Sequence, residues 1–174
     1  MKPHAVEPTD VSTSVTRRSA TLALAALLPL GTVAVAHGAD ASVEAAITKQ
    51  LKSYEQALNV SDLDGVMKLY TEDVVFMPPH AMPVVGREAV RAAYRHIFSA
   101  IKLEITFQID EIRPLSQDWA FARTRSDGTV KVLASNQPAS PEANQELFLL
   151  RRDDGGQWRI ARYIFSTTTP LRRP

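Results

Sequence analysis

The spacing of apolar residues changes once along the chain, near residue 102, from a helical period to a strand period. Before that point apolar residues recur at intervals of three and four, as in Val43, Ile47, Leu51, Tyr54 and Leu58. This stripe predicts a helix with one buried face. From Leu103 to Asp110 apolar and polar residues alternate, which predicts a strand with one wet face. Helices that precede a run of strands predict an α+β fold, with three N-terminal helices on one face of a curved antiparallel sheet.

The helix boundaries follow from capping residues. Ser42 is expected to cap the first helix, and the segment Ser61 to Asp64 to form a capping box for a second, shorter one. A third helix is expected from Gly86 to about Ile101. A short strand over residues 74–77 separates the last two helices. It ends at Pro78, because proline lacks the amide donor that a strand needs.

The later strands are predicted from turn signals. Asp127-Gly128 between β-rich segments indicates a hairpin, residues 136–144 form a polar loop, and residues 153–156 form a second hairpin. The last two strands, around 147–150 and 158–165, are apolar on both faces. One face covers the helices, and a second copy of the chain is the simplest cover for the other, so we expect a homodimer.

The first 41 residues differ from the rest. Arg17-Arg18 precedes a long Ala- and Leu-rich run, and an Ala-x-Ala site follows at Ala39 to Ala41. These are the parts of an export signal, and the paired arginines resemble a twin-arginine signal. We therefore expect residues 1–41 to be removed, leaving an exported periplasmic or extracellular protein without a stable membrane anchor. Residues 42–170 then form a single domain, and residues 171–174 a tail.

Composition narrows the class of partner. The formal net charge of +1 gives no reason to expect binding to nucleic acid. The absence of cysteine excludes thiol catalysis, disulfides and cysteine metal sites. No phosphate loop, dinucleotide fingerprint or nucleophile elbow is present, so we expect no cofactor. We expect no metal either, because no carboxylate cluster has ligand spacing with His80 or His96.

Four segments carry a resemblance to a known superfamily. They are YEQALNVSDLDGVMKLYTEDVVFMPP, VVGREAVRAAYRHIF, DWAFARTRSDGTV and ELFLLRRDDGGQWRIARYIFSTT. Together they resemble the nuclear transport factor 2-like superfamily, which includes SnoaL-like cyclases and ketosteroid isomerases, and they are most similar to its small SgcJ/EcaC-type proteins. The resemblance implies a cone-shaped fold with a pocket between helices and sheet, and usually a dimer. It does not imply one activity, because this fold hosts isomerases, cyclases, dehydratases, hydrolases and binding modules.

The resemblance gives Tyr54 a possible role. In isomerase-like members, a tyrosine at this point of the first helix donates a hydrogen bond to the substrate oxygen. The alternative is a core tyrosine whose hydroxyl is satisfied elsewhere. The isomerase also needs a carboxylate base at the end of the first strand, and that place falls here at Met77-Pro78. Neither residue accepts a proton, so steroid-type isomerisation is not expected.

Two further residues are candidates for proton transfer. His80 lies in a proline-rich elbow after the vacant position, where it is either a general acid or base or a loop residue that braces the chain. Glu146 opens an apolar strand, where it is either an inward acid–base group or a strand-end residue in water. His96 is expected on a solvated helix face.

Apolar and basic residues complete the expected site. Arg123 shares a strand face with Trp119, which favours either binding of a carboxylate or ring, or a place on a sheet rim or dimer interface. The residues expected to contact a substrate are Met77, Tyr94, Trp119, Arg123, Phe148 and Phe165.

Three functions remain open from the sequence. The first is a cofactor-independent isomerase, cyclase or lyase that acts on a small, largely apolar molecule by acid–base chemistry. The second is an exported pocket protein that binds such a molecule without changing it. The third is a dimerisation module with a filled pocket. The direction of His80 and Glu146 separates the first from the second.

Overall fold

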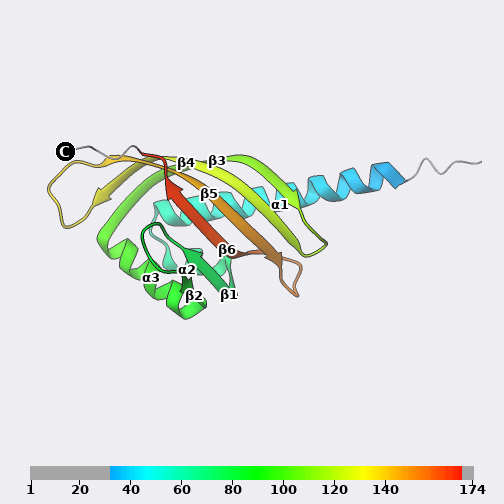
Figure 1. The fold of residues 1–174 in the computed structure, drawn as a ribbon, viewed down its shortest axis with the longest axis horizontal. Helices are drawn as coiled ribbons and strands as arrows, with labels where there is room; N and C mark the ends of the chain where they lie inside the picture. Colours follow the sequence, from blue (N-terminus) through cyan, green and yellow to red (C-terminus); the bar gives the residue numbers. More distant parts are fainter. Residues whose placement is uncertain (1–31, 170–174) are drawn as a thin grey trace, which may run out of the picture. The chain divides into compact units, whose positions relative to one another are not determined.

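The computed structural model describes residues 32–169, which contain three helices and one six-stranded sheet. The elements in chain order are α1 (Thr32–Asn59), α2 (Leu63–Lys68), β1 (Tyr70–Met77), β2 (Val84–Val85), α3 (Arg87–Ala100), β3 (Ile101–Pro114), β4 (Trp119–Val132), β5 (Ser140–Arg152) and β6 (Trp158–Thr167) (Figure 1). This order of elements confirms the predicted α+β fold. Residues 1–31 of the predicted signal lie outside the described residues, and so does the predicted tail at residues 171–174.

The helix α1 buries the predicted stripe against the sheet. Ile47, Leu51, Tyr54 and Leu58 are all at most 5% exposed. The helix begins at Thr32, ten residues before the expected cap at Ser42. Residues 32–41 contain four alanines and no proline, so nothing in them stops a helix.

The next two helices are close to their predicted bounds. The cap of α2 is Asp62, not Ser61: its side chain accepts a hydrogen bond from the Gly65 backbone N–H at 2.9 Å. Ser61 instead has a φ of 54°, a left-handed conformation. The helix α3 follows Gly86 as expected and buries Val90 and Tyr94.

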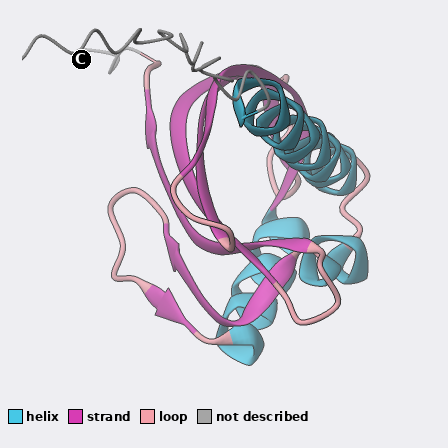
Figure 2. Cartoon of the chain, turned by 90° about the vertical axis from the view of Figure 1, so that its right-hand side faces the viewer, coloured by secondary structure: helices cyan, strands magenta, loops and turns pink. Residues whose placement is uncertain are grey.

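The sheet has the strand order β2-β1-β6-β5-β4-β3, and the helices lie on its concave side (Figure 2). All neighbouring strands are antiparallel except β1 and β6, which are parallel. Parallel neighbours need a long crossover, and here it comprises β2, α3 and the three strands β3 to β5. The curved sheet is therefore antiparallel, as predicted, except at this one pair.

The hairpin predicted at Asp127-Gly128 is wrong, because β4 runs straight through it. Gly128 lies opposite Ile105 on one side and Glu142 on the other. A Cβ atom at Gly128 would lie 2.0 Å from the Glu104 carbonyl oxygen, so this glycine permits a close approach of two strands rather than a turn. The chain reverses instead at residues 115–118 and 133–139.

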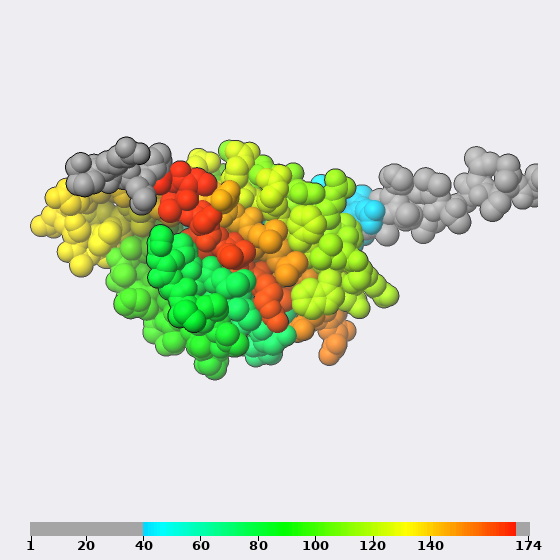
Figure 3. Space-filling model, in the orientation of Figure 1, coloured from blue at the N-terminus to red at the C-terminus, as the bar shows by residue number. Residues whose placement is uncertain are grey.

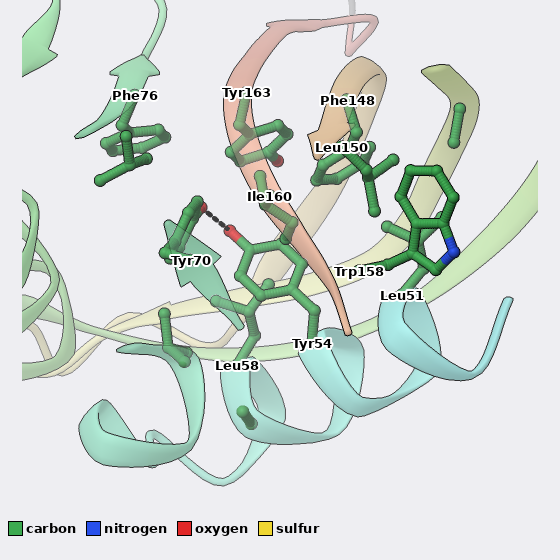
Figure 4. Close-up of a cluster of buried hydrophobic side chains, with 14 of the residues drawn as sticks. Leu51, Tyr54, Leu58, Tyr70, Phe76, Phe148, Leu150, Trp158, Ile160 and Tyr163 are labelled. Carbon is green, nitrogen blue, oxygen red and sulfur yellow. Dashed lines mark hydrogen bonds between the residues drawn. The ribbon is translucent and has the colours of Figure 1, made fainter. Parts of the chain in front are cut away.

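The core between α1 and the sheet is largely aromatic. Tyr54 from the helix points toward Tyr70 and Tyr163 of the sheet (Figure 4). Phe148 stacks on Tyr163 with ring centroids 4.3 Å apart. The core thus brings hydroxyl groups into an apolar setting, and they form one wall of the cavity described below.

The outer face of the sheet lies open in the single chain (Figure 3). On it, Leu147 and Ile164 pair across β5 and β6 and are 41% and 45% exposed. Apolar side chains therefore occupy both faces of these strands, as the sequence indicated. The homodimer inferred from that pattern stays a prediction.

Candidate functional site

A cavity of about 300 Å³ lies between the helices and the concave face of the sheet. Its walls are mostly aliphatic and aromatic side chains from α1, α3, β1, β3 and β6. Its polar residues are three tyrosines, Tyr54, Tyr94 and Tyr163, and a set from β4 and β5, namely Ser126, Glu142, Asn144 and Glu146. An apolar cavity with a few convergent polar groups is the usual form of a small-molecule site.

Three tyrosine hydroxyls meet at one wall. Tyr70 donates a hydrogen bond to the Tyr54 hydroxyl at 3.2 Å, and the Tyr70 and Tyr94 hydroxyls lie 2.8 Å apart. Tyr54 and Tyr94 are also directly hydrogen-bonded, and both line the cavity. Because Tyr70 donates to Tyr54, the three bonds together use all three hydroxyl protons, so a hydrogen bond from Tyr54 or Tyr94 to an oxygen in the cavity would replace one bond within the cluster.

Burial keeps these phenols protonated. It raises the pKa of Tyr54 and of Tyr70 well above the ordinary value. Burial also raises the pKa of Tyr94 to about 12, and hydrogen bonds from the other two tyrosines oppose the shift. The cluster is therefore a neutral hydrogen-bond donor at physiological pH.

Glu146 is the carboxyl group of the site. It is 4% exposed and lies on β5 opposite Thr124 of β4 and Phe165 of β6. The hydroxyls of Thr124 and Ser126 donate to its two carboxylate oxygens. Burial raises the pKa of Glu146, and these two hydrogen bonds oppose the shift. Of the two alternatives left open by the sequence, the inward position is the one observed.

Asn144 lies two residues before Glu146 on the same face of β5. Its side-chain nitrogen donates to Glu142 Oε1 at 3.0 Å. Its side-chain oxygen is buried and has no hydrogen-bond partner among the described residues. Asn144 was not predicted as a site residue, because residues 136–144 were expected to form a polar loop, whereas β5 begins at Ser140. The strand period shared with Glu146 was the signal that could have found it.

Five of the expected site residues lie at or behind the cavity. Tyr54, Tyr94, Glu146 and Phe165 line it. Phe148 is fully buried behind the lining, where it supports Tyr163. Of the residues expected to contact a substrate, Tyr94 and Phe165 therefore lie in the cavity wall, and their contact with a substrate stays a prediction.

His80 is not brought to the cavity. Its side chain is exposed, its φ is 59°, and Pro78 and Pro79 line the cavity in its place. The backbone at His80 is left-handed, a conformation that the proline pattern alone did not indicate. The position where an isomerase base was missing from the sequence is likewise occupied by Pro78. Met77, beside it, is partly buried and does not line the cavity.

Trp119 and Arg123 lie on the outer face of the sheet, away from the cavity. Arg123 forms an ion pair with Asp110 at 2.8 Å and borders an outer groove of about 400 Å³. The guanidinium of Arg151 lies 5.6 Å from the centre of the Trp119 ring. This placement agrees with the alternative that Arg123 lies on a sheet rim or dimer interface rather than in the binding site. His96 is exposed on α3, as predicted.

Two absences hold for the described part of the chain. Residues 32–169 contain no cluster of three or more His, Asp or Glu side chains suited to hold a metal ion. Among the same residues, no helix has the length and apolar character to cross a membrane.

Comparison with known proteins identifies the family. The family model of the SnoaL-like domain matches residues 51–163. The chain belongs to the SnoaL-like family. This assignment confirms the nuclear transport factor 2-like fold expected from the sequence, whereas the SgcJ/EcaC subtype stays a prediction.

Solved structures agree with the SnoaL-like assignment. A ketosteroid isomerase-like protein from Erwinia carotovora atroseptica is 35% identical, with a TM-score of 0.69, over 72% of this chain and 96% of its own. An NTF2-like protein from Shewanella oneidensis is 25% identical, with a TM-score of 0.55, over 71% of this chain and 98% of its own.

A curated relative shares a shorter segment with this SnoaL-like chain. The orange carotenoid-binding protein of Synechocystis is 32% identical over 62 residues, which are 36% of this chain. The match spans only 20% of that relative's length.

Proposed function

We propose that this SnoaL-like chain is a cofactor-independent enzyme that acts on a small, largely apolar molecule by acid–base chemistry, as an isomerase, cyclase or lyase. One observation carries the proposal: Glu146 is a buried carboxyl at the polar end of a mostly apolar cavity. A buried carboxyl is costly unless it has a role or a full set of partners. Burial raises the pKa of Glu146, which makes the ionised carboxyl a stronger base.

The groups of the cavity fit one reaction scheme. Ionised Glu146 takes a proton from a C–H bond next to a carbonyl group of the bound molecule. The electron pair of that bond moves toward the carbonyl oxygen, and the hydroxyl of Tyr54 or Tyr94 donates a hydrogen bond to the oxygen as its charge grows. Return of the proton to another carbon gives an isomerase, and departure of a leaving group gives a lyase.

The scheme differs from steroid isomerisation in the position of the base. The place of the isomerase base at the end of β1 is occupied by Pro78, which lines the cavity without a proton acceptor. Glu146 approaches the cavity from β5, in the centre of the sheet. We therefore expect a different substrate and a different site of proton removal.

Deuterium exchange tests the proposal without the natural substrate. The probe is 2-tetralone, an aromatic ketone with acidic C–H bonds, incubated with the protein in deuterated buffer and followed by proton NMR. Wild type should accelerate exchange, and Glu146→Gln should lower the rate by about 10²–10⁴-fold. Glu104→Gln is the matched control, because Glu104 is exposed on β3 and should leave the rate unchanged. Exchange that persists in folded Glu146→Gln would contradict the scheme.

A second candidate function is binding without catalysis. The carotenoid-binding relative favours it, because the name of that protein describes binding of an apolar molecule. In that case 2-tetralone should bind to wild type with no exchange above that of the buffer. The same experiment thus separates the two functions.

Export is part of the proposal. Removal of residues 1–41 would shorten α1 to begin near Ser42. The first buried residue of α1 that the structure describes is Ile47, so this cleavage would leave the described core intact. N-terminal sequencing of protein recovered outside the cytoplasm should begin near Ser42, and a terminus at Met1 would contradict export by cleavage.

A further inference from the structure

Asn144 offers a hydrogen-bond acceptor at the cavity that no described residue uses. Its side chain is 8% exposed, lines the cavity, and has a buried oxygen with no partner among the described residues. The orientation of the amide is set by Glu142, because only the NH₂ end can face a carboxylate at 3.0 Å. The free oxygen therefore offers an acceptor that a bound molecule can use.

The polar end of the cavity is rich in acceptors. Ser126 commits its proton to Glu146, and so does Thr124. Besides the Asn144 oxygen, the carboxyls of Glu142 and Glu146 face this end, and no lysine or arginine lines the cavity within the described residues. A molecule with a hydroxyl group is favoured here, whereas an anion is repelled by the two carboxylates.

The apolar wall favours a flat ring. Phe76, Tyr163 and Phe165 all line the cavity, and their ring planes lie within 17° of one another, with centroids 5.4 to 6.1 Å apart. Tyr94 is tilted from Phe76 by only 23°. A flat aromatic ring aligned with these planes can contact several of them at once. The volume of about 300 Å³ is at the lower end of the range for small-molecule sites.

We propose that the cavity takes an uncharged, flat aromatic molecule of one or two rings whose hydroxyl group donates a hydrogen bond to Asn144 Oδ1. This inference rests on the proposed function, since it names the substrate class of the same cavity.

The test compares two probes that differ in one group, a hydroxyl in one and a methoxy group in the other. 2-Naphthol carries the donor, and 2-methoxynaphthalene has the same rings without it. By calorimetry, wild type should bind 2-naphthol about tenfold more tightly, as expected for one additional buried hydrogen bond. The anion 2-naphthoate should bind more weakly than either.

Variants assign the preference to Asn144. Asn144→Leu, of similar size but without the acceptor, should bind the two naphthalene probes within about twofold of each other. Gln145→Leu is the matched control, because Gln145 is the neighbouring amide on the exposed, opposite face of β5, and it should keep the tenfold preference. The side-chain amide NMR signal of Asn144 in wild type supplies a measurement that needs no variant. It should shift further with 2-naphthol than with the ether, because both probes carry ring currents and only 2-naphthol donates a hydrogen bond.

Three results would overturn the inference: no binding of either naphthalene probe, equal binding of both to wild type, or an unchanged Asn144 signal with 2-naphthol. None of these depends on proton transfer by Glu146. Failure of the substrate class is therefore distinguishable from failure of the proposed function, which is decided by deuterium exchange in Glu146→Gln.

Discussion

The chain contains four tyrosines, and all of them are buried around one wall of the cavity, with at most 5% exposure. Burial raises the pKa of each, that of Tyr94 to about 12. An unfolded chain ionises its tyrosines near pH 10. The native state therefore holds these protons more tightly, so its stability is complete below about pH 10 and falls as the pH rises further.

An alkaline titration should show this coupling directly. Phenolate absorbance should stay flat through about pH 10 and then rise together with the loss of the far-UV circular dichroism signal. The same protein in denaturant, as a control, should titrate near pH 10. A reversible rise near pH 10 with the native dichroism signal retained would show that at least one phenol is open to water.

For single residues, the local sequence predicts the direction of some side chains and leaves that of others open. The position of Tyr54 followed from the helical stripe, and its inward direction is confirmed. The direction of Glu146 was left open, because a residue at the start of an apolar run can be inside or at the strand end. The role of His80 was left open between proton transfer and bracing of the loop, because prolines restrict a backbone without setting which way a side chain points.

At the scale of elements, the change of apolar period predicted the division between helices and strands and most of the buried faces. The hairpin predicted at Asp127-Gly128 is wrong because Asp-Gly occurs both in turns and where two strands approach each other closely. The difference depends on β3, a strand that is distant in sequence from the glycine. Local turn signals do not contain that information.

Gly128→Ala should therefore weaken the sheet. The added Cβ would overlap the Glu104 carbonyl, and Gly128 has a φ of 155°, so we expect a loss of at least about 2 kcal/mol in the free energy of unfolding. Gly155→Ala is the control: its Cβ would lie 3.4 Å from Asp153, an ordinary contact, and the change should stay within about 0.5 kcal/mol. Denaturant unfolding measures both, and equal small effects would contradict the close-approach account.

At the scale of the whole molecule, the open face of β5 and β6 predicts a homodimer. Leu147 and Ile164 are apolar, paired and partly exposed in the single chain, so a second copy can bury them. Light scattering should give twice the mass of the chain at micromolar concentration.

Substitution should locate the dimer contact. Leu147→Lys should produce monomers that still bind aromatic probes, because its side chain points away from the cavity. Leu115→Lys is the control, since Leu115 is 58% exposed in the turn after β3 and should leave the dimer intact. If light scattering shows a wild-type monomer at micromolar concentration, the outer face is not a dimer interface.

The central claim is that Glu146 is a cavity-facing base, and its carboxyl titration is the most direct test. Carbon-detected NMR of labelled protein, with Glu146→Gln to assign the signal, follows this one group against pH. We predict a midpoint above the ordinary glutamate value of about 4.3, and a change in that midpoint when 2-naphthol fills the cavity. A midpoint at or below about 4.3 that 2-naphthol leaves unchanged would contradict the account.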